Sequence, residues 1–207
     1  MILADPILNS LRVRRALNDA DRQAVLAVRW QGYRKYGCAN GLVAEGIDSS
    51  PGAVLLLATD ENDTPVGTLR ILDRRHGPIE LDGFLPVDAL IPAARQPIAE
   101  ATRFSVPPSP ASHCVKLVLW KAYYRYAAAT GICTMLVAVR PSAARDYKRL
   151  LFENLGPSGT FAHAQLGGLA HETWAFDVHT GPQRYRNIGH PFYEFFVERE
   201  HPAITFT

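Results

Sequence analysis

Ile98-Ala-Glu-Ala-Thr-Arg-Phe-Ser-Val106 is a largely apolar segment that two prolines follow directly, and it predicts a strand that ends there. Ser112 to Thr130 predicts a long helix, with Ser112 as its N-cap and Gly131 in the stopping position. Ile132 to Val139 is a continuous apolar run, which is typical of a buried strand. Together these three elements predict a β–α–β passage near the middle of the chain.

The residues before this passage predict a helix and a hairpin. Asp19 to Lys35 carries apolar side chains at helical spacing, and Asp19 or Asp21 can cap its first turn. Ala53 to Thr59 and Val66 to Leu72 are apolar runs joined by a polar turn, which is typical of a β-hairpin.

The residues after the passage predict a second helix and further strands. Pro141 to Leu155 predicts a helix, because proline favours a first helical turn and Gly156 follows its end. Thr160 to Gln165 and Glu172 to Val178 predict strands, and Pro191 to Glu200 predicts a short amphipathic helix. The order of elements predicts a mixed α/β fold whose sheet is mostly antiparallel.

Length and composition limit the class of protein. The 207 residues are 47% hydrophobic and 20% charged, which predicts a single globular domain over residues 1–207. Residues 73–97 hold several prolines and predict a loop-rich excursion from this domain. A net charge of +2 gives no argument for nucleic-acid binding, and no run of about 18 apolar residues predicts a membrane span.

The cysteines and the first residues predict a cytoplasmic protein. The three cysteines form no CxxC pair, which favours reduced thiols over a disulfide or zinc framework: Cys38, Cys114 and Cys133. The chain begins with an apolar segment and places its arginines later, which is the reverse of a signal peptide.

Several motifs of known chemistry are absent from the sequence. It contains no GxxxxGK[ST] loop and no strand-borne GxGxxG, so nucleotide phosphates have no obvious binding loop. HExxH and GxSxG are absent too, and the seven histidines show no metal-like spacing. We therefore expect no metal and no permanently bound cofactor.

Charged residues stand where apolar ones are expected. Glu100 and Arg103 lie within the first strand quoted above, Arg70 lies in the hairpin, and Arg29 lies in an apolar helix. Buried charges need partners, so these residues predict either an ion-pair network or a working site. The network is favoured for Arg29 and Arg70, and both alternatives stay open for Glu100 with Arg103. A shared site for that pair requires a bulge near Thr102, because residues three apart in a regular strand face opposite sides.

Five features in this order resemble the acyl-homoserine-lactone (autoinducer) synthases and their relatives, the N-acyl amino acid synthases. The most specific is Glu100-Ala-Thr-Arg103-Phe104, which matches the family motif E-x-[ST]-R-F. The others are Arg29-Trp-Gln-Gly-Tyr33, Asp48 in the following loop, Gly67-Thr-Leu-Arg70, and Phe84. The resemblance extends over residues 20–156.

The resemblance implies the GNAT (Gcn5-related) acyltransferase fold, a mixed sheet splayed between its fourth and fifth strands, where a phosphopantetheine arm enters. By resemblance, Ile98–Val106 is strand four and Ile132–Val139 is strand five. Acyl-CoA enzymes of this fold bind pyrophosphate on a [QR]-x-x-G-x-[GA] loop. Here Pro107-Pro-Ser-Pro-Ala-Ser-His113 has no glycine, which favours an acyl carrier protein over coenzyme A as the donor.

The resemblance also implies roles for individual residues. Glu100 would be the catalytic base, and Arg103 would keep it charged and in position. The substrates would contact Arg29, Tyr33, Asp48, Arg70, Phe84, Phe104 and Ser105, with Arg29 or Arg70 binding a carboxylate of the acceptor. Acidic carrier proteins would dock on the basic residues Arg145, Lys148 and Arg149. The donor would be acyl-phosphopantetheine on acyl carrier protein, or acyl-CoA, and the acceptor a small-molecule amine.

Departures from the autoinducer branch concern the acceptor. The usual tryptophan after the first helix is missing, and Ser49-Ser50-Pro51 replaces a second loop acid. An amino acid or similar amine is therefore favoured as acceptor. Three alternatives stay open: an acyl-homoserine-lactone synthase using S-adenosylmethionine, an acyl-CoA-dependent acetyltransferase, and a non-catalytic GNAT-fold module that binds an acyl ligand or a partner.

Overall fold

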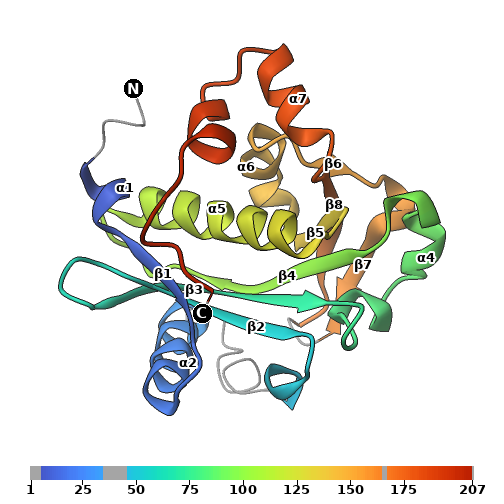
Figure 1. Ribbon diagram of the computed structural model, residues 1–207. Coiled ribbons are helices and arrows are strands. Elements are labelled where there is room, and N and C mark those ends of the chain that lie inside the picture. The colour runs from blue at the N-terminus through green and yellow to red at the C-terminus, as the bar shows by residue number, and fades with distance from the viewer. Residues whose placement is uncertain (1–5, 35–45, 165–166, 207) are drawn as a thin grey trace.

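The protein is built on one mixed β-sheet with helices on both faces (Figure 1). The computed structural model describes residues 6–34, 46–164 and 167–206. Within these residues the sheet has 8 strands: β1 (Arg12–Arg15), β2 (Ala53–Thr59), β3 (Pro65–Asp73), β4 (Ile98–Ser105), β5 (Thr134–Val139), β6 (Glu153–Asn154), β7 (Thr160–His163) and β8 (Leu169–Asp177). The strand order is β1-β2-β3-β4-β5-β8-β6, with β7 paired to β8. Neighbouring strands run antiparallel except β4 and β5, which are parallel.

Helices lie on both faces of this sheet. The helices are α1 (Pro6–Ser10), α2 (Asp19–Tyr33), α4 (Val87–Leu90), α5 (Ser112–Thr130), α6 (Ala144–Arg149) and α7 (Gly181–Asn187). Shorter 3-10 turns are η3 (Gly46–Ser49), η4 (Glu80–Gly83), η5 (Ala93–Arg95), η6 (Pro141–Ala143) and η7 (Pro157–Gly159), and η9 (Glu194–Glu198) is a π-helical turn. Figure 1 shows α5 lying along one face of the sheet and α2 against the other.

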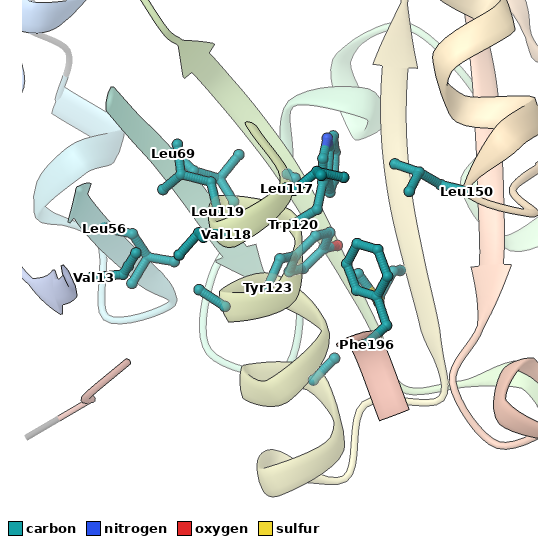
Figure 2. Packing of buried hydrophobic residues seen from close by; sticks show 14 of the residues in the cluster. Val13, Leu56, Leu69, Leu117, Val118, Leu119, Trp120, Tyr123, Leu150 and Phe196 are labelled. Atoms are coloured by element: carbon teal, nitrogen blue, oxygen red, sulfur yellow. The ribbon is translucent and has the colours of Figure 1, made fainter. Parts of the chain in front are cut away.

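Alternating side chains of β2 explain how both faces are buried. Leu56 belongs to the large apolar cluster that includes α5, whereas its neighbour Leu57 packs with Val25 of α2. Figure 2 shows Leu119 of α5 beside Leu69 of β3 within the large cluster. Because successive strand residues point to opposite faces, one apolar run supplies both contacts. A membrane span is ruled out for the helices of the described residues, which are too short or too polar.

The sheet opens between β4 and β5. Their pairing runs from Ile98 with Thr134 to Ala101 with Val137. Beyond these pairs β4 continues to Ser105, and the two strands part. This is the splayed sheet that the resemblance implied.

The bulge required by the sequence lies in β4, one residue beyond Thr102. Thr68 of β3 pairs with Ser105 and Arg70 pairs with Thr102, so β4 holds one extra residue between these pairs. Arg103 has a φ of 50°, which lies in the left-handed region that non-glycine residues rarely adopt. The predicted hairpin and the β–α–β passage are also present, so the central part of the prediction is confirmed.

Some predicted helix caps and ends were wrong. Asn18, rather than Asp19 or Asp21, caps α2, because its side chain accepts a hydrogen bond from the Asp21 backbone. Ser112 does not cap α5; its hydroxyl donates to the carbonyl of Pro107 at 2.9 Å and so stabilises the preceding turn. Gly131 does end α5, in the left-handed conformation.

The segments on the C-terminal side depart further from the prediction. The helix expected over 141–155 ends at Arg149, because Leu151 adopts a φ of 58° that a helix does not allow. The tail helix expected over 191–200 is the π-helical turn η9. Three residues named in the sequence analysis, Lys35, Cys38 and Gln165, lie outside the described residues.

Candidate active site

A cleft of about 630 Å³ occupies the opening between β4 and β5. Its polar part is formed by side chains of η4 and β4, notably Glu80, Glu100 and Arg103. Its apolar part includes Phe104, whose ring lies 5.1 Å from that of Trp120 in α5. The cleft can therefore hold a molecule that combines a polar reacting group with an apolar chain.

Glu100 is a buried carboxyl at the polar part of the cleft. It is only 1% exposed, and its Oε2 accepts a hydrogen bond of 3.1 Å from the backbone N–H of Leu81. Burial, followed by repulsion from Glu80, raises the pKa of Glu100 to about 8. Proton transfer from an ammonium ion to a carboxylate becomes easier as the pKa of the carboxyl rises toward that of the amine.

The bulge turns Arg103 toward a different carboxylate from the one predicted. Arg103 Nη1 donates to Glu80 Oε2 at 3.0 Å, and Arg103 Nη2 lies 3.0 Å from Glu80 Oε1. From the sequence we expected Arg103 to keep Glu100 charged. That expectation was wrong, because Arg103 forms its ion pair with Glu80 and the pKa of Glu100 is raised.

A chain of ion pairs lies behind the cleft. Arg29 forms a bidentate pair with Asp48 at 2.6 and 3.1 Å, and Arg70 Nη1 donates to the same carboxylate at 2.8 Å. Arg70 also donates to Thr102 Oγ1 at 2.8 Å and forms an ion pair with Glu80. Burial alone would raise the pKa of Asp48, but hydrogen bonds from both arginines hold it below its usual value.

Three residues that were predicted to contact substrate, Arg29, Asp48 and Arg70, form this ion-pair network. The side chains of Arg29 and Arg70 are 0% exposed, and Asp48 lies between them. The described residues that line the cleft do not include these three. The network alternative fits both Arg29 and Arg70, and binding of an acceptor carboxylate by either arginine stays a prediction.

The other predicted contacts do line the cleft: Tyr33, Phe84, Phe104 and Ser105. Ser105 Oγ donates to the carbonyl of Val28 at 3.0 Å, which ties the bulge to α2. A Cβ on Gly32 would lie 2.0 Å from that hydroxyl oxygen, so glycine permits the close approach of helix and strand. Tyr33 is half-buried, and burial raises the pKa of its phenol.

Sequence reasoning predicted Phe84 but missed Glu80 and the two aromatic residues that pack against Phe84, which are Phe161 and His163. Phe84 stacks on Phe161 with ring centroids 4.7 Å apart, and His163 lies 4.9 Å from Phe84. His163 Nε2 is 4.0 Å from Glu80 Oε2, so the aromatic wall formed by these three side chains borders the carboxylates. Glu80 lies in the proline-rich segment that predicted only loops, and no periodic signal singled it out.

The predicted docking residues lie on α6, on the opposite side of the cleft from α2. Arg145, Lys148 and Arg149 are all exposed, and Arg149 also lines the cleft. Lys116 and Arg140 add positive charge to the same lining. No group of three or more residues suited to hold a metal ion occurs in the part of the chain that the structure describes.

Comparison with known proteins gives one family and several related folds. A model of the family described as N-acyl amino acid synthase FeeM matches residues 24–167. None of the curated proteins compared with the chain matches it.

Three solved structures illustrate the shared fold. The structure of FeeM, an N-acyl amino acid synthase from uncultured soil microbes, has a TM-score of 0.69 at 17% identity, covering 86% of this chain and 96% of that one. A CoA-dependent acyl-homoserine lactone synthase, BjaI, has a TM-score of 0.59 at 18% identity, covering 94% and 97%. A GCN5-related N-acetyltransferase from Kribbella flavida has a TM-score of 0.54 at 21% identity, covering 81% and 98%. These similarities confirm the GNAT-like fold.

Proposed function

The chain belongs to the FeeM family of N-acyl amino acid synthases and is an acyltransferase, and we propose that it transfers a fatty acyl group from acyl carrier protein to the amine of an amino acid or a similar small acceptor. One observation carries this proposal. The buried carboxyl of Glu100 faces a cleft that opens where β4 and β5 part. It is therefore placed where a thioester and an amine can meet.

The proposed reaction begins with a proton transfer to Glu100. The acceptor arrives as an ammonium ion, and ionised Glu100 removes one of its protons. The free amine attacks the thioester carbonyl carbon, and an N–C bond forms. When the C–S bond then breaks, the thiolate of the phosphopantetheine leaves and takes up the second proton lost by nitrogen. The products are an amide and a free thiol, and one proton is released in total.

The bulge has two proposed contributions to this reaction. Arg103 and its partner Glu80 fix the backbone of β4 beside the reacting atoms. Beyond Ala101, β4 parts from β5, so backbone N–H groups between Arg103 and Ser105 can stabilise the negative oxygen that forms during attack. Arg29, Asp48 and Arg70 support this arrangement from behind, because Arg70 holds both Thr102 and Glu80.

The donor side combines an apolar lining with a basic rim. Phe104 and Trp120 offer apolar surface to the acyl chain. The exposed cations Arg145, Lys148 and Arg149 would attract the acidic surface of a carrier protein. Acyl-CoA is the other possible donor, because one enzyme of the same fold is a CoA-dependent synthase.

We also propose that residues 1–207 act as one acyltransferase domain. Leu8 of α1 and Ile204 near the C-terminus belong to the same apolar cluster as α5. Val13 of β1 accepts and donates backbone hydrogen bonds with Thr205 and Ala203. Such shared packing supports a single folding unit.

Mass spectrometry of lipid extracts tests the proposed activity. Cells that overproduce the wild-type protein should accumulate an N-acyl amino acid, and Glu100→Gln should lower its formation about 10² to 10⁴-fold. Glu153→Gln is the matched control, because Glu153 is an exposed carboxylate paired with Arg184 at 2.8 Å. Detection of an acyl-homoserine lactone instead would identify S-adenosylmethionine as the acceptor. Normal product formation by Glu100→Gln would contradict the general-base role.

A charge reversal on α6 tests the donor. The double variant Arg145→Glu, Lys148→Glu should lower kcat/KM with acyl carrier protein about tenfold at low salt, because steering by rim charges mainly sets the association rate. The loss should shrink as salt is added. The same variant should leave the rate with a free acyl-pantetheine thioester unchanged. An equal loss with both donors would contradict docking on α6.

A further inference from the structure

Two carboxylates share the polar part of the cleft in unlike surroundings. Glu80 forms ion pairs with Arg70 from β3 and Arg103 from β4, and its side chain is 13% exposed. Glu100 accepts a backbone N–H from Leu81 and is almost completely buried. One carboxylate is thus held beside two cations, whereas the other lies in an environment that disfavours charge.

The charge of the surrounding cluster suggests what the site binds. Among the residues that the structure describes, Arg29, Arg70 and Arg103 form ion pairs with the two carboxylates Asp48 and Glu80. If an ammonium ion enters and Glu100 releases its proton to water, the total charge of the cluster stays the same. The site can therefore exchange a proton for an ammonium ion without a change in its net charge, and the new ion pairs offset part of the cost of desolvating the ammonium.

We propose, on the basis of the proposed function, that Glu80 is a second catalytic carboxylate, which binds the ammonium ion of the acceptor beside Glu100. Glu80 stays ionised throughout and holds the ammonium in place. Glu100 loses its proton as the ammonium binds, and then accepts one of the ammonium protons to free the nucleophile. Division of two neighbouring carboxylates into a fixed anion and a proton acceptor follows from their different surroundings.

Other ionisable groups around Glu100 are arranged to permit this division. Arg70 and Arg103 lie on the strands, and Glu80 lies on η4. Tyr123 of α5 donates its hydroxyl hydrogen to the carbonyl of Ala99 at 2.5 Å, and its pKa is raised by burial and by Glu100, so it stays neutral. His163 borders Glu80 from β7.

The aromatic wall provides a probe for the test. Phe84 stacks on Phe161, and His163 packs against Phe84 and borders Glu80. A small arylalkyl amine can therefore place its ring against these aromatic side chains and its ammonium group beside the carboxylates. The probe is 2-phenylethylamine, and its neutral match is 2-phenylethanol. Both are measured by calorimetry at pH 7, with no acyl donor present.

The wild-type protein should bind the amine at least tenfold more tightly than the alcohol, because a charge-assisted hydrogen bond contributes roughly that factor or more. Glu80→Gln should remove the preference, while Glu153→Gln should keep it. In two buffers of different ionisation enthalpy, the wild type should release a proton on binding the amine, and Glu100→Gln should release none.

The outcomes separate this inference from the proposed function. An unchanged preference in Glu80→Gln would overturn the inference, even if the lipid assay finds an acylated product. If Glu80→Gln does not fold, the wild type still decides, because equal binding of amine and alcohol, or no proton release, would overturn it. An ammonium preference that depends on Glu80, without any acylated product, would keep the site and reject acyl transfer.

Discussion

The two faces of β3 and β4 differ in character around Arg70. On the face toward α5, Leu69 and Ile71 alternate along β3 and belong to the main apolar cluster. On the opposite face, Arg70 stands between them, and Glu100 and Thr102 stand on β4 beside it. Apolar burial stabilises the face toward α5, whereas the opposite face buries charges at a cost.

The charges on the buried face are stabilised because cations and anions alternate in one chain of ion pairs. Asp48 joins Arg29 to Arg70, and Glu80 joins Arg70 to Arg103. Each anion therefore serves two cations. Removal of one anion should affect more than one partner, whereas truncation on the apolar face should remain a local loss of packing.

The largest expected effect on stability comes from Asp48→Asn. This change leaves two fully buried guanidinium groups without their shared anion, and it should lower the free energy of unfolding by about 4 kcal/mol. Urea unfolding measures the loss, with Glu153→Gln as the exposed-carboxylate control. A change in Asp48→Asn no larger than that of the control would show that the network is not needed for folding.

A smaller loss is expected on the apolar face. Leu69 is 0% exposed between the sheet and α5. Leu69→Ala should therefore lower the free energy of unfolding by about 3 kcal/mol, because apolar burial is lost and a cavity is left. At a temperature where the variant stays folded, kcat should remain near that of the wild type. A large fall in kcat without loss of stability would mean that the two faces are not separate.

The third expected effect depends on pH and comes from the burial of Glu100. Its pKa is raised from an ordinary 4.5 to about 8 on folding. Between these values the folded state binds more protons than the unfolded state, so this group lowers stability as pH rises. Glu100→Gln should therefore gain stability over the wild type by about 1.4 kcal/mol per pH unit between pH 5 and 8. Parallel pH dependence of the two proteins would contradict a raised pKa.

The sequence predicted those parts of the molecule that rest on local pattern. The runs that form β2, β3, β4 and β5, and the helix α5 with Gly131 at its end, were visible as apolar periodicity with glycine punctuation. The bulge in β4 followed from a single demand, that Glu100 and Arg103 face one site. Pattern and chemistry agreed there, and the structure places the bulge one residue away from the expected position.

The remainder depends on contacts distant in the sequence. Glu80 lies in a proline-rich stretch, and only the fold brings it to Arg70 and Arg103. The helix over 141–155 was overestimated because Phe152, which is buried, is drawn into the core, and Leu151 takes a left-handed conformation on the way. Local helix propensity does not reveal such tertiary contacts.

We propose that Glu100, on the charged face, performs the chemistry while the α5 face provides stability. The most direct test measures the initial rate of acyl transfer and the urea midpoint of Glu100→Gln and Leu69→Ala side by side. We expect Glu100→Gln to lose turnover about 10² to 10⁴-fold with an unchanged or raised midpoint, and Leu69→Ala to keep turnover with a lowered midpoint. Retained turnover in Glu100→Gln would contradict this proposal.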